Sequence, residues 1–518
     1  MRDDAESKAP KVVVQYQGQV VYMATQKPHA IFLPFPAQGH ITPMLYVAKL
    51  LHSKGFHITF INTEFNHNRL INSGAIDPKA KIEGFRFEAI PDGLPPSNAN
   101  ATQDVGLLLD SIMDCVMSAP LKQLILRLNN QISGPPVTCM VRDATMFSAE
   151  SVAAELGIPQ AMLWTVSGCT FMRVLCTRFK GSNITNSSDP LLLFREWICG
   201  HSYRIDTSNA RHVAGIDSIP AMPGICLKDL PSTVRTADLD DKIHHFSLRV
   251  ATQKPITSSL HIIDTLEASD HEILDAAEQK FQVPRPYAVG PLFGLYEQIS
   301  VGCSRLNSVR SNLWEEENEC LEWLENSKDG SVIYVNFGSI AVLTPDQLKE
   351  FSWGLANSNY PFLWIIRPDL VSGESALLEE EFVEEIRGRG TFARWCPQKQ
   401  VLAHPSVGGF LTHCGWNSMS ESIYHGVPML CWPYFGDQRP NCRQACNVLG
   451  VGIEIDNQVT REKVEGAIKE LMEGAKGKEM RTTAAKWKEE ARKATRPGGS
   501  SHGNFERIVS DLLGMKSD

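Results

Sequence analysis

The chain has 518 residues and a formal net charge of −9 at pH 7, with 43% hydrophobic and 21% charged residues. A chain of this length exceeds what one hydrophobic core supports, so the sequence predicts two globular domains. The acidic balance excludes the basic surface that nucleic-acid binding requires, and no apolar run approaches the roughly 20 residues of a transmembrane helix.

The first 26 residues predict a loosely ordered N-terminal extension. They begin with acidic residues, and Gln and Gly interrupt their short apolar stretch, whereas a signal peptide has a basic start and a continuous apolar core. The 13 cysteines are an odd number and include no CxxC pair, which favours reduced thiols over a disulfide framework. Both features predict a cytoplasmic protein.

From His29 onward, short apolar runs alternate with helical patterns. The pattern predicts a strand over 29–35, an amphipathic helix over 41–55 that stops at Gly55, and a second strand over 57–62. A strand over 137–143, followed by a helix, repeats this order. Such βαβ alternation predicts a parallel sheet with helices on both faces for a first domain over 27–290.

The same alternation returns after a segment that is rich in Gly, Ser and Asn and has no clear periodicity. We interpret that segment, 291–313, as the interdomain linker, and 314–499 as the second domain. Residues 500–518 predict a C-terminal helix that packs back on the first domain. The expected architecture is α/β, with two doubly wound, Rossmann-like domains facing a cleft; the second sheet would contain strands over 331–337, 361–367, 390–395, 407–413 and 428–434.

Ligands of doubly wound sheets bind beyond the carboxyl ends of the strands. His413 ends the strand 407–413, and a helix follows that opens with Asn417 and Ser418. A helix N-terminus presents unpaired N–H groups and about half a positive charge, and these three side chains add donors. Glu421 lies one turn further, where a carboxylate accepts two ribose hydroxyls. The stretch predicts a site for a nucleoside diphosphate; capping of the helix needs only one such residue.

Other nucleotide and metal motifs are missing. No GxGxxG follows a strand, which argues against a nicotinamide oxidoreductase, and there is no GxxxxGK[ST] loop. His413 is followed by Cys414, but no spacing brings three or four metal ligands together, so we expect no metal site. The segment GSSHG at 499–503 fits a GxSxG nucleophile pattern, but it follows a charged helix, so we expect Ser500 or Ser501 to cap the final helix.

The segment WCPQKQVLAHPSVGGFLTHCGWNSMSESIYHGVPMLCWPYFGDQ, residues 395–438, closely resembles the signature box of plant family-1 UDP-glycosyltransferases, including its length of 44 residues. The similarity continues through PHAIFLPFPAQGHITPML, NTEFNHNRL, PGICLKDLP and VNFGSIAVLTPDQL. The resemblance implies a GT-B fold, in which the C-terminal domain holds the UDP-sugar and the N-terminal domain holds most of the acceptor.

The resemblance also implies roles for individual donor-site residues. Trp395 stacks on the uracil, a contact typically worth ~1–3 kcal/mol, and Cys396 belongs to the same site. The ribose is held by Gln398 and Glu421. The diphosphate is received by His413, Asn417, Ser418 and Ser339, and the sugar is lined by Trp416, Asp437 and Gln438.

A candidate acid–base pair lies in the first domain. His40 follows the first strand and Asp143 ends the strand 137–143, so both lie at carboxyl ends of parallel strands. A carboxylate fixes the tautomer of a neighbouring imidazole and stabilises the imidazolium. A strand-end histidine alone is more often structural, but the resemblance assigns His40 as general base and Asp143 as its orienting partner. Arg142 replaces a small residue of the family, and strand alternation places it on the opposite face.

The resulting hypothesis is an inverting glycosyltransferase that moves glucose from UDP-glucose to a hydroxyl of a small lipophilic acceptor, giving a β-glucoside. We expect a metal-independent monomer without a cofactor, a nucleic-acid partner or a transmembrane segment. Glucose is expected as the donor sugar because, in the family that the chain resembles, a Gln at the end of the box goes with UDP-glucose. The alternative is a catalytically impaired nucleotide-sugar-binding homologue, although both members of the pair are present. Residues 178–216 depart from the family pattern, and Ser218 stands where relatives have Trp, so the acceptor stays open.

Overall fold

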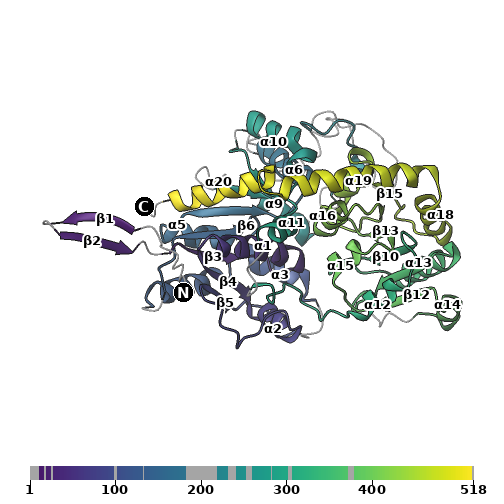
Figure 1. Cartoon of the computed structure of the whole chain (residues 1–518), viewed down its shortest axis with the longest axis horizontal. Helices are drawn as coiled ribbons and strands as arrows, with labels where there is room; N and C mark the ends of the chain where they lie inside the picture. Colours follow the sequence, from purple (N-terminus) through teal and green to yellow (C-terminus); the bar gives the residue numbers. More distant parts are fainter. Residues whose placement is uncertain are drawn as a thin grey trace, which may run out of the picture.

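The computed structural model describes residues 11–16, 19–24, 27–97, 102–131, 134–181, 219–231, 241–252, 260–281, 283–300, 306–371 and 378–515. Two parallel sheets form two domains that lie side by side (Figure 1). Most of the divergent segment 178–216, together with Ser218, lies outside the described residues. Among the described residues, no helix has both the length and the apolar character needed to cross a membrane.

The N-terminal sheet has seven parallel strands in the order β5-β4-β3-β6-β7-β8-β9. Side chains of β3 alternate between two hydrophobic clusters: Ile31 and Leu33 enter one, and Ala30 and Phe32 enter the other. Both faces of the sheet are therefore covered, as the continuous apolar runs predict. The strands are β3 (His29–Leu33), β4 (His57–Thr63), β5 (Phe85–Ile90), β6 (Cys139–Asp143), β7 (Gln160–Trp164), β8 (Leu260–Ile263) and β9 (Tyr287–Ala288).

Helices cover both faces of this sheet. In α1, the residues Ile41, Met44, Val47 and Leu51 are buried, at the spacing of one helical face. The helices of the domain are α1 (Gln38–Ser53), α2 (Glu64–Asn72), α3 (Val105–Met113), α4 (Ser118–Asn129), α5 (Phe147–Glu155), α6 (Gly168–Gly181), α9 (Lys242–Thr252) and α10 (Glu267–Phe281), with a 3₁₀ turn, η1, at Leu227–Asp229.

The C-terminal sheet has six parallel strands in the order β12-β11-β10-β13-β14-β15. In both sheets the chain winds outward in one direction and then returns to the centre, so each domain is doubly wound, as predicted. The strands are β10 (Val332–Asn336), β11 (Phe362–Ile365), β12 (Gly390–Ala393), β13 (Val407–Thr412), β14 (Met429–Cys431) and β15 (Gly452–Glu454).

Local sequence signals define several helices of this domain. Thr344 and Gln347 form a capping box at the start of α13, with Pro345 at the first helical position. Gly426 ends α16 in the left-handed conformation. The helices are α12 (Glu319–Glu325), α13 (Pro345–Ser358), α14 (Glu380–Glu385), α15 (Gln398–Ala403), α16 (Trp416–His425), α17 (Gln438–Arg443), α18 (Arg461–Met472) and α19 (Ala475–Thr495), with a π-helix, η3, at Gln444–Val448.

Part of the segment 291–313, which the sequence predicts as the interdomain linker, is helical. Helix α11 (Leu292–Ile299) packs on α1, and its Leu292 and Leu295 are buried. A Cβ atom at Gly294 would lie only 2.4 Å from the Tyr424 ring on α16, so glycine lets α11 approach the second domain closely. Apolar side chains at helical spacing and this close contact outweigh the turn-forming composition of the surrounding residues.

The predicted N-terminal extension contains two short strands. Strands β1 (Lys11–Tyr16) and β2 (Gln19–Ala24) form an antiparallel hairpin that pairs with no other described strand. Both segments are rich in Val and Tyr, which have high strand propensity. That propensity accounts for the hairpin, and the loosely ordered extension over 1–26 stays a prediction.

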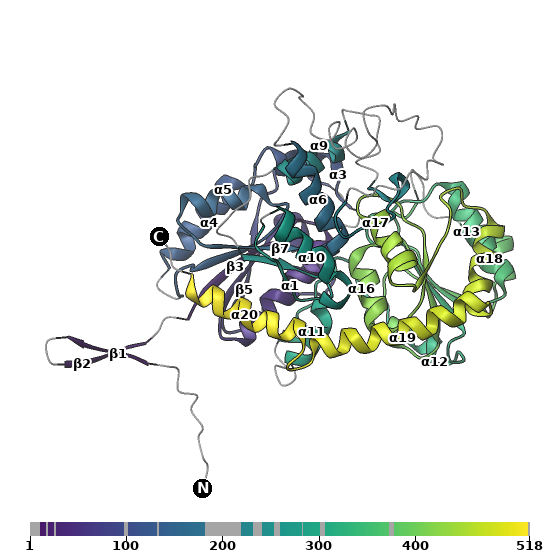
Figure 2. The same ribbon diagram turned by 90° about the horizontal axis from the view of Figure 1, so that it is seen from above.

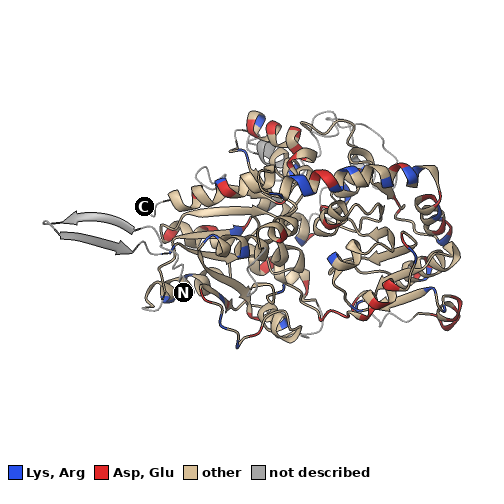
Figure 3. Ribbon diagram, viewed as in Figure 1, with Lys and Arg blue, Asp and Glu red and all other residues tan. Residues whose placement is uncertain are grey.

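The final helix, α20 (Ser500–Gly514), continues from α19 and lies against the N-terminal domain (Figure 2). Phe505, Ile508 and Leu512 enter an N-terminal hydrophobic cluster. Neither Ser500 nor Ser501 caps the helix; the cap is Gly499, and the Ser501 hydroxyl donates to the Gly290 carbonyl at 2.6 Å. In Figure 3, basic and acidic residues alternate along the described part of the C-terminal helices, including α19.

Candidate active site

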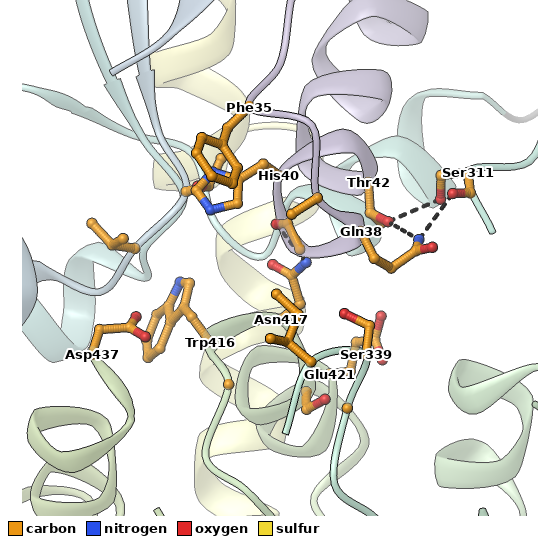
Figure 4. Close-up of a pocket in the computed structure, with 18 of the residues that line it drawn as sticks. Phe35, Gln38, His40, Thr42, Ser311, Ser339, Trp416, Asn417, Glu421 and Asp437 are labelled. Carbon is orange, nitrogen blue, oxygen red and sulfur yellow. Dashed lines mark hydrogen bonds between the residues drawn. The ribbon is translucent and has the colours of Figure 1, made fainter. Parts of the chain in front are cut away.

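A cavity of about 910 Å³ lies between the two domains. Strand order reverses at β3 and β6 in the N-terminal sheet and at β10 and β13 in the C-terminal sheet, and residues after these strands line the cavity. Helices α1 and α16 both begin there. Figure 4 shows His40 and Phe35 on one side, facing Asn417, Trp416 and Asp437 on the other. The cavity therefore occupies the switch points of both sheets, where ligands of such folds bind.

The structure brings His40 and Asp143 together. His40 Nδ1 lies 2.7 Å from Asp143 Oδ2, and because an ionised carboxylate only accepts, the imidazole must carry its proton on Nδ1. The other ring nitrogen, Nε2, is then the basic one, and the 28% exposed side chain lines the cavity. Thr165 Oγ1 also lies 2.9 Å from Nδ1. This arrangement is suited to removing a proton from a bound hydroxyl.

Electrostatics adjust both members of the pair. Burial alone would lower the pKa of His40, but the charge of Asp143 and the hydrogen bond to it raise that pKa above its usual value. Burial would raise the pKa of Asp143, yet His40 and two hydrogen bonds from Thr145 lower it, so the carboxylate stays ionised. An ionised Asp143 stabilises the imidazolium that forms when His40 accepts a proton.

Arg142 leaves this pair undisturbed, which confirms the argument from strand alternation. Its guanidinium is fully buried and donates to the Gln160 side chain at 3.1 Å and to Glu150 Oε2 at 3.3 Å. The Asp143 carboxylate instead accepts from His40 and Thr145. Arg142 thus contributes a partly buried ion pair behind the site and does not displace Asp143.

On the C-terminal side, Gln398 connects the expected ribose-binding residues. Its Nε2 donates to Glu421 Oε2 at 2.8 Å and to Ser418 Oγ at 3.1 Å. Its Oε1 accepts from the Tyr334 hydroxyl at 3.0 Å and from Asn336 Nδ2 at 2.8 Å. Gln398 starts α15 and the others lie on β10 and α16, so this network connects three elements of the domain.

His413 lies at the carboxyl end of β13 and lines the cavity, but it is uncharged. Burial, reinforced by the positive charge of Arg367, lowers its pKa to about 4. A Cβ atom at Gly338 or at Gly415 would lie 2.4 Å from the ring, so the ring fits between two glycine backbones, and Gly338 also has a φ of +73°. Neutral His413 can donate one N–H to an anion but supplies no positive charge of its own.

The other residues expected to bind the diphosphate, Ser339, Asn417 and Ser418, also line the cavity. Each makes a hydrogen bond within the protein, through its side chain or its backbone. Asn417 Nδ2 donates across the domain boundary to the Gly39 carbonyl at 2.9 Å. The Ser418 hydroxyl accepts from Gln398, and the Ser339 carbonyl accepts from Thr102 Oγ1 at 3.4 Å. The structure thus places all three at the start of α16 or after β10, and Asn417 directly connects this end of the cavity to the residue before His40.

The expected sugar-binding residues are more occupied by protein contacts than predicted. The indole N–H of Trp416 donates to the Asp264 carbonyl at 2.5 Å, and the ring is buried. The side-chain oxygen of Gln438 accepts hydrogen bonds from the backbone N–H groups of Tyr434 and Phe435. This oxygen is therefore already engaged by the protein and is not free to accept a hydrogen bond from a sugar hydroxyl. Asp437 accepts from Asn441 Nδ2 at 3.0 Å, and burial raises its pKa.

At the opposite end of the cavity, Trp395 is stacked on Trp314, with ring centroids 4.9 Å apart and an interplanar angle of 23°. The guanidinium of Arg69 lies 4.1 Å from the Trp314 centroid, so the N-terminal domain supports this stack. Cys396 also lines the cavity, but its buried thiol lies 3.3 Å from the Tyr334 hydroxyl.

Sequence reasoning missed the residues that shape the acceptor side. Thr165 follows β7, so the rule that ligands meet strand carboxyl ends could have found it. No sequence signal marked Phe246 on α9, whose ring centroid lies 5.9 Å from that of Phe35 beside His40. The apolar residues on this side come from several elements and include Phe35, Leu109, Trp164, Val166, Val174, Ile243, Phe246 and Val250.

The fold brings together three cysteines that no spacing in the sequence groups, and the expectation of no metal site stays a prediction. The sulfur atoms of Cys414, Cys431 and Cys442 all lie within 4.8 Å of one another, and all three residues are buried. Sequence spacing could not show this, because Cys414 lies between β13 and α16, Cys431 ends β14 and Cys442 lies in α17, and only the folded sheet brings these positions together.

Comparison with known sequences agrees with this geometry. Residues 307–486 match the family model described as "UDP-glucoronosyl and UDP-glucosyl transferase". A 7-deoxyloganetin glucosyltransferase from Catharanthus roseus is 48% identical, over 95% of this chain and 98% of its own. An (R)-mandelonitrile beta-glucosyltransferase from Prunus dulcis is 45% identical, over 94% and 98% of the two chains.

Solved structures share the fold. Os79 from O. sativa, in complex with UDP, superposes with a TM-score of 0.74 at 24% identity, covering 93% of this chain and all of its own. A UDP-glucosyltransferase from Polygonum tinctorium capable of glucosylating indoxyl gives a TM-score of 0.73 at 26% identity, covering 95% and 100%. The GT-B arrangement is therefore confirmed.

Proposed function

The chain belongs to the plant family-1 UDP-glycosyltransferases, and we propose that it is an inverting enzyme that transfers glucose from UDP-glucose to a hydroxyl of a small lipophilic acceptor. The observation that carries this proposal is the His40–Asp143 pair, which faces the Gln398 network across one cavity. We assign residues 27–290 to acceptor binding, 314–499 to donor binding and the segment between them to the linker.

The proposed reaction begins when Nε2 of His40 takes the proton of the acceptor hydroxyl. The acceptor oxygen forms a bond to the anomeric carbon as the bond from that carbon to the UDP oxygen breaks, and UDP leaves with the electron pair. Because His40 and the start of α16 lie on opposite sides of the cavity, attack from the His40 side inverts the anomeric centre and gives a β-glucoside. Asp143 stabilises the imidazolium until its proton is released.

The proposed donor contacts follow the position of each residue along the cavity. Trp395, with one face on Trp314, presents its ring system to the uracil, while Gln398 and Glu421 meet the ribose. The N-terminus of α16, with neutral His413, Asn417, Ser418 and Ser339, stabilises the diphosphate charge, so we propose that no metal ion is required. Cys396 lies beside Trp395 at the uracil end. Asp437 and the amide nitrogen of Gln438 bind the glucose hydroxyls, beside Trp416.

The apolar acceptor side supports a lipophilic acceptor, since Phe35, Trp164 and Phe246 offer large apolar surfaces next to His40. The relatives named for 7-deoxyloganetin and (R)-mandelonitrile support an acceptor of modest size. We further propose that the enzyme is a cytoplasmic monomer.

The test is to measure kcat/KM for UDP-glucose and UDP-galactose with one shared acceptor, chosen from a panel of small alcohols. A site that hydrogen-bonds a hydroxyl leaves partners unpaired when a stereocentre inverts, so we expect at least about a tenfold preference for UDP-glucose. NMR spectroscopy of the product should show a β linkage, and activity should survive exhaustive treatment with EDTA.

Three outcomes would contradict the proposal in different places. Equal values for the two donors would refute the assignment of the sugar, and an α linkage would refute inversion. UDP binding without turnover on any acceptor would instead support the impaired binding homologue.

A further inference from the structure

A cluster of buried thiols lies behind the donor end of the cavity. The sulfur atoms of Cys414, Cys431 and Cys442 lie within 4.8 Å of one another. Cys446, in the π-helix η3, is partly exposed, and its sulfur lies 4.0 Å from that of Cys442. Among the described residues, the three buried cysteines form the one group of at least three His, Cys, Asp or Glu side chains close enough to hold a metal ion.

The surrounding backbone keeps space for these sulfur atoms. A Cβ atom at Gly452, on β15, would lie 2.9 Å from the Cys446 sulfur and 3.1 Å from the Cys431 sulfur. Glycine at this position therefore lets the edge of the sheet approach the thiols without displacing them. The π-helix that carries Cys446 is a rare conformation that occurs most often near functional sites.

We propose that Cys414, Cys431 and Cys442 bind one thiophilic cation such as Cd²⁺ or Zn²⁺, and that Cys446 is the ligand through which the cation enters. Thiolates are the ligands that such soft or borderline ions prefer. With metal–sulfur bonds of about 2.3 Å, the sulfurs around one ion lie roughly 4 Å apart, so the cluster needs only a small contraction. Binding breaks three S–H bonds, forms three metal–sulfur bonds and releases three protons.

The cluster is connected to the sugar end of the donor site. Asn441 precedes Cys442 on α17, and its amide donates to the Cys414 carbonyl at 3.1 Å and to Asp437 Oδ2 at 3.0 Å. Its own oxygen accepts from Ser167 Oγ of the other domain at 2.7 Å. A contraction that draws Cys442 toward Cys414 therefore shifts the start of α17, where Asp437 lies. Resting on the proposed function, we infer that bound metal inhibits glucose transfer.

The binding test uses reduced, chelator-treated full-length protein titrated with CdCl₂. We expect one Cd²⁺ per chain, detected by sulfur-to-cadmium charge-transfer absorption in the ultraviolet and by proton release. Cys442→Ala and Cys431→Ala should each lose the absorption and bind Cd²⁺ at least about tenfold more weakly. The matched control is Cys139→Ala, which removes a buried thiol from β6 of the other domain and should keep wild-type binding.

Circular dichroism and thermal melting check that each variant is folded, and the wild-type titration remains decisive if one variant is not. A wild-type titration without the absorption, or a Cys442→Ala variant with wild-type binding, would overturn the site. Cys446→Ala should slow Cd²⁺ uptake, and unchanged uptake would overturn its role in entry.

The inhibition test measures kcat/KM for UDP-glucose with one equivalent of Cd²⁺. We expect at least about a tenfold loss for the wild type, reversed by chelator, and no loss for Cys442→Ala. If the metal-bound wild type keeps full activity, the proposed connection from the cluster to Asp437 is wrong. The charge-transfer absorption would still support the metal site itself. A protein that binds Cd²⁺ but transfers no sugar to any acceptor would refute the proposed function, because the spectroscopic titration does not depend on catalysis.

Discussion

The two sides of the cavity are built differently. On the donor side, Gln398 joins four polar side chains into one hydrogen-bonded network. On the acceptor side, one hydrogen-bonded pair, His40 and Asp143, lies among aromatic and aliphatic residues. A polar network holds one ligand shape, whereas an apolar wall accepts many shapes at similar cost. We therefore expect the donor side to select one polar ligand, and the acceptor side to supply mainly apolar surface and a base.

The largest expected effect comes from removing the base. His40→Ala should lower kcat by about 10²–10⁴-fold, the usual range for a lost general base. UDP binding, measured by calorimetry, should change little, because His40 lies across the cavity from the donor network. His52→Ala is the matched control on the same helix, and its activity should stay near wild type. If His40→Ala keeps most of the wild-type turnover, His40 is not the general base, and the acceptor side does not have the proposed chemical role.

The next effect tests the donor network. Gln398→Ala leaves the Tyr334 hydroxyl, Asn336 and Glu421 each without one partner, and a buried polar group left unpaired costs about 1–3 kcal/mol. We expect the KM for UDP-glucose to rise roughly ten- to a hundredfold, while the acceptor KM stays within about twofold. Gln458→Ala, on the surface of the same domain, is the control. An equal rise in both KM values would break the separation between the two sides.

A smaller effect is expected on the acceptor side. Phe246→Ala removes a ring that contacts Phe35 and Phe147, and truncating such an apolar contact costs on the order of 1–2 kcal/mol. The acceptor KM should rise about tenfold, with UDP-glucose binding unchanged. Steady-state kinetics with each substrate varied in turn measures this. If calorimetry shows that Phe246→Ala binds UDP more weakly, the apolar acceptor side also contributes to donor binding.

The smallest effect is a shift in pH dependence. Asp143 raises the pKa of His40, and the base must be neutral to act, so kcat/KM should fall as the pH drops through a pKa above 6.5. Asp143→Asn removes the negative charge, so the pKa of His40 falls and the acid limb should move to lower pH. The maximal rate also falls, because the imidazolium loses its partner. A pH profile with an unmoved acid limb would contradict the assignment of His40 to that limb.

The sequence was most informative where function depends on strand ends and helix starts. Doubly wound alternation placed His40, Asp143 and His413 at strand carboxyl ends, and the structure brings all three to one cavity. It could not show that burial keeps His413 neutral, because burial depends on how Gly338 and Gly415 enclose the ring. Likewise, the contacts from Trp416 to Asp264 and from Asn417 to Gly39 join residues far apart in the chain. Such contacts between domains leave no local pattern.

Helix α20 has a consequence for how the protein is made. Phe505, Ile508 and Leu512 complete the hydrophobic core of the first domain, yet the ribosome adds them roughly 200 residues after β9. At about 5–20 residues per second, that interval lasts roughly 10–40 s. During it, the apolar surface of the first domain that α20 later covers lacks this partner. Domain-by-domain folding during translation, the usual route for long chains, is thus incomplete here until the second domain has also been synthesised.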